Sequence, residues 1–598
     1  MSDTCRAGSA RIVAYSVLMA ASFAAIALSA CAGPAKSTAA PDALAAEIIR
    51  LANQYVAAFA QQFPEYAEFA GLAEAPHDRL SDNSLAAVAK WRATEDRFAT
   101  ELARIDRTKL WGRPEWTIHG LFRESLEASR GSRVCRTEFW PVSQLTGWQA
   151  TMAKLADMQP VGTPKARADA LARWKDLPRY LSTEMGNLHE GLQAGFSTPR
   201  RNVELVVAQL DALLAPAPRE SPLFGPAKRD GDAAFAAALA EVIEREITPA
   251  IRRYRDFLRD EYAPRARTAI AVTAHLDGLA CYRAEFRSYT SLDRPPEETF
   301  RLGEQRVAQN MKEAVAIGRE AFGLESVEKI QQRLRDDPAN RFATRQEVLQ
   351  FARDAVERSR KAIPRWFGRV PEAPIAVEPH PTFVEASASD QYLPPSADGS
   401  RPGTYRIKLY KPEDQLRSQS EITAFHEAYP GHHLQISLAL ERPAAHPITR
   451  LVGTSSFTEG WARYAEALSE EMGLYSLDHA RISRRMWPSR GMVVDPGIHV
   501  LGWSREQAID YIRDSGRFAA HEAESLVDRI VMWPGQLTAY DTGALELFAL
   551  RRQAEKELGT AFDIGVFHDR LLENGSLTLE MARETMDRWL QVTRRTGS

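Results

Sequence analysis

The chain repeats the hydrophobic spacing of amphipathic helices along most of its length. In ALAAEIIRLANQYVAAFAQQF, from Ala43 to Phe63, apolar residues recur at positions i, i+3, i+4 and i+7. Similar stretches follow at residues 84–105, 165–195, 231–260, 296–322, 343–362, 504–530 and 543–557. No fixed repeat period connects them, which argues against a solenoid. The pattern therefore predicts a large, mainly α-helical protein.

One segment, residues 371–414, breaks this pattern. It is rich in proline, serine and aspartate and contains alternating apolar and polar positions. Thr404–Tyr410 is typical of a short strand, and Ile375–Glu378 is its expected partner. The open edge of a small sheet binds an extended peptide through backbone hydrogen bonds, although a plain surface hairpin is an equal alternative. Tyr405 is a candidate for lining the substrate groove, and packing on the strand face explains it equally well.

Residues 1–30 have the features of a secretory signal peptide. Two arginines precede the apolar run Ile12–Leu28, and small residues follow it. The Leu-Ser-Ala-Cys sequence that ends at Cys31 resembles the bacterial lipobox, in which the cysteine is acylated and becomes the first residue of the mature protein. Residues 31–41 are then a short lipidated tether. An ordinary signal peptide with an incidental cysteine is the alternative.

The lipid on Cys31 is the expected link to the membrane, because no other stretch offers the roughly 20 apolar residues of a spanning helix. We expect the body in the bacterial cell envelope, facing the periplasm. Ala32, in place of an aspartate, favours the outer membrane. Cys135 and Cys281 are the other cysteines of the mature chain. They either form a disulfide, as an oxidising compartment permits, or stay as two buried thiols.

Composition and charge narrow the function classes. The 598 residues are 44% hydrophobic and 26% charged, as in soluble globular proteins. The 76 basic and 79 acidic residues give a net charge of -3 without a long run of either sign. This balance argues against a nucleic-acid partner. The sequence leaves the oligomeric state undetermined.

The clearest chemical signal is the histidine cluster HEAYPGHH at residues 426–433. In the zinc-hydrolase motif H-E-x-x-H, two histidines one helical turn apart bind one ion, and the glutamate faces the metal-bound water. His426 and Glu427 fit the first two positions. The fifth position is Pro430, so the simple motif fails.

A bulge in the helix is needed to bring a second histidine to the ion. Along an unbroken axis His433 lies about 10 Å from His426, too far for a shared ion. The Pro-Gly pair between them is suited to an extra turn. A three-residue insertion makes His433 the ligand, and a two-residue insertion makes it His432. We favour His433, because His-Leu-Gln from this residue resembles the His-Ile-Gln that closes the zinc helix of angiotensin-converting enzyme.

The third ligand is expected from a following helix. Thr-Glu-Gly-Trp-Ala-Arg-Tyr, which begins at Thr458, resembles the Asn-Glu-Gly-Phe-Ala-x-Tyr segment of zinc aminopeptidases, whose glutamate binds zinc. This resemblance assigns Glu459 as the ligand, with an ordinary helix start as the alternative. Glu466 lies two turns further on the same face and is a candidate for orienting a ligand histidine.

The lipobox, the H-E-x-x-P-G-H-H-x-Q signature and the T-E-G-W-A segment together resemble the bacterial Domain of Unknown Function 885 family, which is grouped with the zincin metallopeptidases. The resemblance covers roughly residues 45–595. It implies a large helical zincin-like metallopeptidase fold with a deep cleft and a small β-sheet next to the active-site helix. A helical region at 42–370 would form part of the cleft and a metal-site catalytic region would occupy 371–598, in one continuous domain.

The same resemblance suggests roles for residues in the C-terminal part. In related helical zinc peptidases a histidine and a tyrosine donate hydrogen bonds to the oxyanion. His499 and Tyr540 are the candidates, with core packing as the alternative. Arg529 would clamp a substrate carboxylate, although a structural ion pair is the favoured interpretation. Ile530 and Asp541 depart from the family pattern, which has tyrosine and lysine there, and put the substrate range in doubt.

These observations predict a zinc-dependent metallopeptidase that hydrolyses short oligopeptides. One Zn²⁺ held by His426, Glu459 and either His433 or His432 would activate a water, and Glu427 would take its proton. A hydrolase of a non-peptide ester or amide and a non-catalytic metal-binding lipoprotein are the alternatives. The intact Glu427 argues against the second of these. The native metal and the choice between exopeptidase and endopeptidase remain open.

Overall fold

The computed structural model describes residues 40–596, except 382–384, 386–388, 397–398, 400 and 443–445. The predicted signal peptide and Cys31 lie outside the described residues. Within them, no helix is both long enough and apolar enough to cross a membrane.

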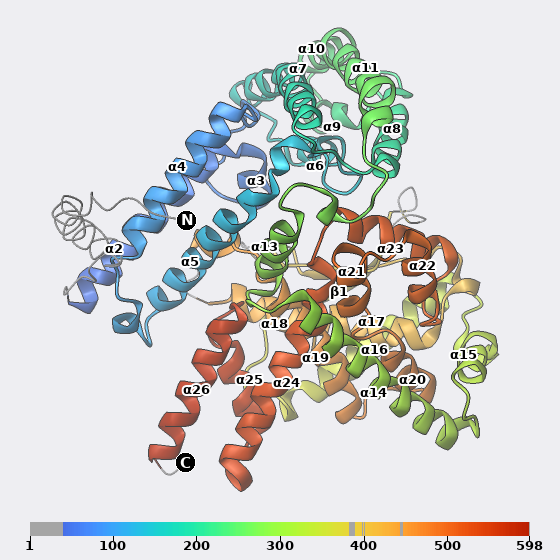
Figure 1. The fold of residues 1–598 in the computed structure, drawn as a ribbon. Helices are drawn as coiled ribbons and strands as arrows, with labels where there is room; N and C mark the ends of the chain where they lie inside the picture. The colour runs from blue at the N-terminus through green and yellow to red at the C-terminus, as the bar shows by residue number, and fades with distance from the viewer. Residues whose placement is uncertain are drawn as a thin grey trace, which may run out of the picture.

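The N-terminal part is built from helices, several of which begin with proline, where the missing N–H removes no helical hydrogen bond. Figure 1 shows most of them at the top and the left of the view, with α13 in the middle beside the C-terminal helices. Their bounds are α2 Pro41–Gln62, α3 Pro64–Phe69, α4 Leu85–Leu102, α5 Pro114–Ser132, α6 Trp148–Met158, α7 Pro164–Gln193, α8 Arg200–Leu214, α9 Gly225–Asp230, α10 Ala233–Val242, α11 Thr248–Phe257, α12 Ala263–Arg265 and α13 Gly278–Thr290.

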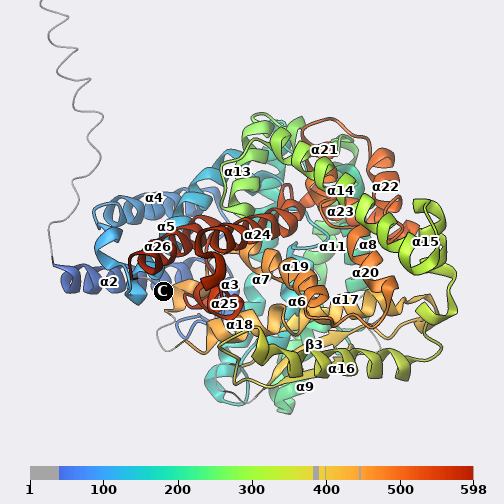
Figure 2. The same cartoon turned by 90° about the horizontal axis from the view of Figure 1, so that it is seen from below.

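The second part contains the remaining helices and the sheet, as both views show (Figures 1 and 2). The helices are α14 Pro296–Phe322, α15 Val327–Asp336, α16 Arg345–Ala362, α17 Arg417–Glu427, α18 His432–Leu440, α19 Ser455–Glu471, α20 Asp478–Met486, α21 Gly491–His499, α22 Arg505–Arg513, α23 Ala520–Met532, α24 Ala539–Leu558, α25 Ile564–Leu572 and α26 Leu579–Thr596. The predicted mainly helical class is therefore confirmed. The stretch 504–530 differs from its prediction, because residues 514–519 separate α22 from α23.

A three-stranded sheet lies just before α17 in the sequence. Its strands are β1 Ile375–Pro379, β2 Gln391–Leu393 and β3 Gly403–Ile407, in the order β1-β3-β2. The predicted pairing is confirmed: β1 and β3 are parallel, with Val377 opposite Tyr405. β2 pairs antiparallel with the other side of β3, so the edges of this sheet are β1 and β2.

The largest hydrophobic core joins distant parts of the chain. It contains residues from α2, α4 and α5 together with residues from α17, α19, α24 and α26. Two glycines let α19 and α24 approach closely: a Cβ on Gly543 would lie 1.7 Å from the carbonyl oxygen of Ser456, and one on Gly460 would lie 2.6 Å from Gly543. α19, which carries Glu459, is thereby fixed against the C-terminal helices.

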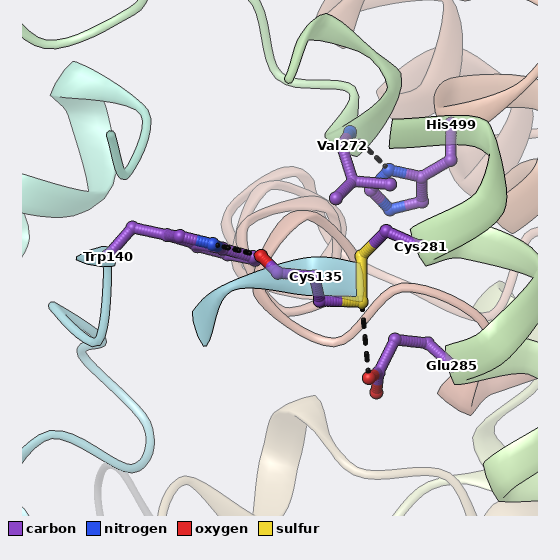
Figure 3. The surroundings of a disulfide bond; sticks show 6 residues. All are labelled: Cys135, Trp140, Val272, Cys281, Glu285 and His499. Carbon is purple, nitrogen blue, oxygen red and sulfur yellow. Dashed lines mark hydrogen bonds between the residues drawn. A yellow bond between two sulfur atoms is a disulfide. The ribbon is translucent and has the colours of Figure 1, made fainter. Parts of the chain in front are cut away.

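Cys135 and Cys281 form a disulfide between the short helical turn that follows α5 and helix α13. Figure 3 shows this bond beside Trp140, Glu285 and His499. The indole N–H of Trp140 donates to the backbone carbonyl of Cys135 at 2.9 Å. Of the two alternatives left open by the sequence, the structure contains the disulfide.

Candidate functional site

The histidine cluster lies where the helix breaks between α17 and α18, as the Pro-Gly pair predicts. Residues 428–431 form the connection, and the Tyr429–Pro430 peptide bond is cis. The indole N–H of Trp461, on α19, donates to the carbonyl of Pro430 at 2.9 Å. Gly431 folds so closely onto the end of α17 that a Cβ there would lie 1.9 Å from the carbonyl oxygen of His426. Only glycine fits this position without movement of the backbone that carries His426.

Gly431→Ala is therefore expected to lower the free energy of unfolding by about 1–3 kcal/mol, as overpacking of a closed site does. Urea denaturation followed by circular dichroism measures the change. Gly453→Ala is the matched control, because a Cβ there meets nothing within 4 Å. Equal unfolding midpoints for both variants and the wild type would contradict the close approach.

The break brings His426, His432 and Glu459 together. Their ligand atoms all lie within 4.8 Å of one another. The Nε2 atoms of both histidines are 3.5 Å from Oε2 of Glu459. Two ligand atoms about 2.1 Å from a tetrahedral ion lie roughly 3.4 Å apart, so these separations and this donor set fit a zinc site.

The preference for His433 as the second ligand is wrong in this structure. His433 is fully buried and points away from Glu459: its Nδ1 is 2.9 Å from the hydroxyl of Tyr392, and its Nε2 is 3.1 Å from that of Tyr429. Burial lowers the pKa of His433 to about 4. His432 is the residue that the break returns to His426, as a two-residue insertion predicts. The resemblance of His-Leu-Gln to the His-Ile-Gln segment of angiotensin-converting enzyme did not predict how many residues are inserted here.

The carboxylate of Glu466 and the guanidinium of Arg463 lie behind His426, on the side away from Glu459. Nδ1 of His426 donates to Glu466 at 2.9 Å, which fixes the ring so that Nε2 faces Glu459. Arg463 in turn donates to both oxygens of Glu466, at 2.8 and 3.0 Å. The orienting role predicted for Glu466 matches these contacts.

Charge around His426 favours a cation at its Nε2. Burial alone would lower the pKa of His426, but Glu459 and Glu466 raise it to about 10. Burial would likewise raise the pKa of Glu459, but His432 and His426 hold it below its usual range. The arrangement therefore concentrates negative charge at a point where a divalent cation would supply the balancing charge.

Glu427 lines a cavity of about 400 Å³ together with His426. It is the last residue of α17, and burial raises the pKa of its carboxyl group. Its side chain forms no hydrogen bond or ion pair with any residue of the described part of the chain. A nearly buried carboxyl group without a hydrogen bond or ion pair among the described residues is available to accept and return a proton.

Tyr540 and Arg529 line the same cavity, as their predicted roles require. Arg529, on α23, donates to the side chain of Gln536 at 2.8 Å and to the hydroxyl of Tyr540 at 3.4 Å. Burial and the nearby Glu459 raise the pKa of Tyr540, so its hydroxyl stays protonated. The structural ion pair considered for Arg529 is absent among the described residues.

His499 is not part of this site, which corrects its assignment as an oxyanion donor. It is fully buried beside the disulfide (Figure 3). Its Nδ1 accepts from the backbone N–H of Val272 and its Nε2 donates to the carbonyl of Ile530, both at 3.0 Å. Burial lowers the pKa of His499 to about 4. Both ring nitrogens are engaged, so His499 joins α21, α23 and the segment before α13.

Tyr405 is likewise not a groove residue. It lies on the central strand β3, is fully buried, and donates its hydroxyl to Asp390 at 2.9 Å. Of the two alternatives for Tyr405, a groove residue or a packed strand residue, the structure shows the second. Asp390, which sequence reasoning missed, does line the cavity that contains Glu427.

Arg517 also lines this cavity, and the sequence analysis did not predict it as a site residue. It lies in the connection between α22 and α23, within a stretch read as one continuous helix. The serine and glycine before it, Ser515 and Gly516, were the available signal for a break.

Comparison with known proteins gives a family and a fold. The model of a family of bacterial proteins of unknown function, DUF885, matches residues 64–586. The solved structure of a putative lipoprotein from Colwellia psychrerythraea is similar, with a TM-score of 0.82 and 22% identity over 92% of this chain and 99% of that chain. One of unknown function from Shewanella oneidensis has a TM-score of 0.75 and 19% identity over 90% and 99%. No curated protein matches the chain.

Proposed function

The chain belongs to the DUF885 family, and from the chemistry of its site we propose that it is a zinc-dependent peptidase. The observation that carries the proposal is the convergence of His426, His432 and Glu459 beside the carboxyl group of Glu427, which has no hydrogen bond or ion pair among the described residues. Two imidazoles and one carboxylate suit zinc and leave a coordination position for water. A purely structural metal site would have no use for a base at this point.

Each nearby side chain has a defined task in such a reaction. A Zn²⁺ ion, when bound, supplies Lewis-acid activation of water and of the peptide carbonyl. Glu427 takes a proton as the water oxygen attacks the carbonyl carbon. When the C–N bond breaks, Glu427 returns this proton to the leaving amine, so the carboxylate is regenerated. The protonated hydroxyl of Tyr540 donates a hydrogen bond to the oxyanion that forms.

We propose that the protein works on the periplasmic side of the cell envelope, held by lipid on Cys31 and most simply in the outer membrane. Three observations support this placement: the lipobox, the disulfide between Cys135 and Cys281, and the similarity to two putative lipoproteins. Short oligopeptides are the proposed substrates, because the cavity at Glu427 measures about 400 Å³.

The proposal is tested with a pool of synthetic peptides and the mature protein from Ala32 onward. We expect cleavage products in mass spectra after loading with zinc, their loss after chelation, and their return when zinc is added back. Cleavage that continues in chelator would contradict a metal-dependent reaction. Stable zinc binding without cleavage of any peptide would overturn the peptidase proposal and favour a non-peptide ester or amide, or a binding role.

A further inference from the structure

Arg517 is a half-buried cation that no anionic group among the described residues engages directly. Its side chain lines the cavity that contains His426 and Glu427. Within the described residues, its guanidinium forms neither an ion pair nor a hydrogen bond. Burial, together with the nearby Arg463, lowers its pKa to about 10. A guanidinium group that is partly shielded from water and has no directly bound anion is suited to an anionic ligand.

Arg529 is a second cation of this kind. Among the described residues, its side chain donates hydrogen bonds only to the neutral groups of Gln536 and Tyr540. Its Nε is buried and has no hydrogen-bond partner. Its guanidinium also lies 5.3 Å from the ring of Trp533, which leaves its planar donor edge for other contacts.

The acidic groups of the cavity, apart from Glu427, already have partners. Glu466 binds His426 and Arg463, and Asp541 lies 3.8 Å from Arg463. The others accept hydrogen bonds as follows: Asp390 from the hydroxyl of Tyr405 and the N–H of Lys408, and Glu522 from the N–H of Ala519. Glu522, Glu466 and Asp541 affect Arg517 only through space. Donors of both arginines therefore remain for a ligand.

We propose that Arg517 and Arg529 bind the free C-terminal carboxylate of the peptide, so that the enzyme removes a short fragment from the carboxyl end of its substrate. This inference rests on the proposed peptidase function. Guanidinium groups bind carboxylates through paired, charge-assisted hydrogen bonds. A cavity of about 400 Å³ is at the small end of ligand pockets, which span roughly 300–1,000 Å³. The fragment between the cleaved bond and the carboxylate is accordingly short.

The test compares one peptide with a free C-terminal carboxylate against the same peptide with a C-terminal amide. For the wild type we expect a kcat/KM roughly 10- to 100-fold higher on the free acid, as the loss of charge-assisted hydrogen bonds predicts. Arg517→Gln and Arg529→Gln should each reduce this preference by lowering kcat/KM on the free acid more than on the amide. Arg517→Lys, which keeps the charge, should restore part of it.

Arg513→Gln is the matched control, since Arg513 is exposed on the preceding helix and does not line this cavity. Equal kcat/KM values on the acid and the amide for the wild type would overturn the inference. An equal loss on both peptides in the arginine variants would also overturn it, because that result indicates a structural role. Thermal unfolding checks that each variant is folded.

Binding measurements separate this inference from the proposed function. If neither peptide is hydrolysed, calorimetry with Glu427→Gln protein compares the affinities for the acid and the amide. Tighter binding of the acid that Arg517→Gln removes would support the carboxylate site even though the peptidase proposal had failed. Equal affinities would overturn the carboxylate site as well.

Discussion

Glu427→Gln is expected to reduce peptide hydrolysis by a factor of about 10²–10⁴, the usual contribution of a general acid–base group. Glutamine keeps the size of the side chain but does not accept the proton of the attacking water or return it to the amine. Because Glu427 forms no hydrogen bond or ion pair within the described chain, the change breaks neither kind of contact there. The zinc content should stay at the wild-type level. Single-turnover hydrolysis and atomic absorption measure the two quantities.

The control for this variant is Glu413→Gln, an exposed position in the short turn before α17. It should hydrolyse peptides at the wild-type rate. Wild-type activity in Glu427→Gln would show that Glu427 is not the base. A loss of zinc together with activity would instead show that Glu427 acts through metal binding.

His432→Ala is expected to lower zinc affinity by more than the roughly 10- to 100-fold that loss of a hydrogen-bond partner of a ligand costs. The reason is direct: Nε2 of His432 lies 3.5 Å from Glu459, at the separation of two ligands on one ion. His433→Ala should retain one zinc per chain, because its ring nitrogens contact Tyr392 and Tyr429 instead. Competition with a chelating dye measures both affinities.

The pair of neighbouring histidines provides its own control. His433→Ala is expected to be the less stable variant, because it leaves a cavity in a fully buried place and removes the contacts of His433 with Tyr392 and Tyr429. Loss of zinc in His433→Ala with retention in His432→Ala would restore the ligand set first favoured from the sequence. Circular dichroism excludes unfolding as the cause of a lost ion.

Several parts of the site could be predicted from local sequence. His426 and Glu427 match the first two positions of a known zinc-binding motif. The Pro430-Gly431 pair predicts the break in the helix that follows them. Glu459 was predicted as a ligand from the resemblance of its local segment to that of zinc aminopeptidases. The strand pair β1 and β3 was also predictable, because alternation over a few residues reports on one local element.

Other features depended on contacts between distant segments. The sequence predicted His499 and Tyr540 equally as oxyanion donors. Tyr540 lines the cavity, whereas His499 forms hydrogen bonds with the backbones of Val272 and Ile530. Arg517 reaches the cavity only because residues 514–519 interrupt what looked like one helix. The hydrophobic spacing within α22 and α23 does not reveal that a side chain in the break between them lines the cavity.

The sequence by itself therefore determined the helical class, the small sheet and the family signature, since spacing along one element limits which side chains share a face. It also predicts the type of chemistry. Only the tertiary structure decided that His432 and not His433 joins His426 and that His499 is a core residue. It also placed two arginines, which have no acidic partner among the described residues, in the cavity that contains Glu427. These choices depend on how helices far apart in sequence pack together, because burial and partner geometry, rather than residue type, decide which polar groups remain free to act.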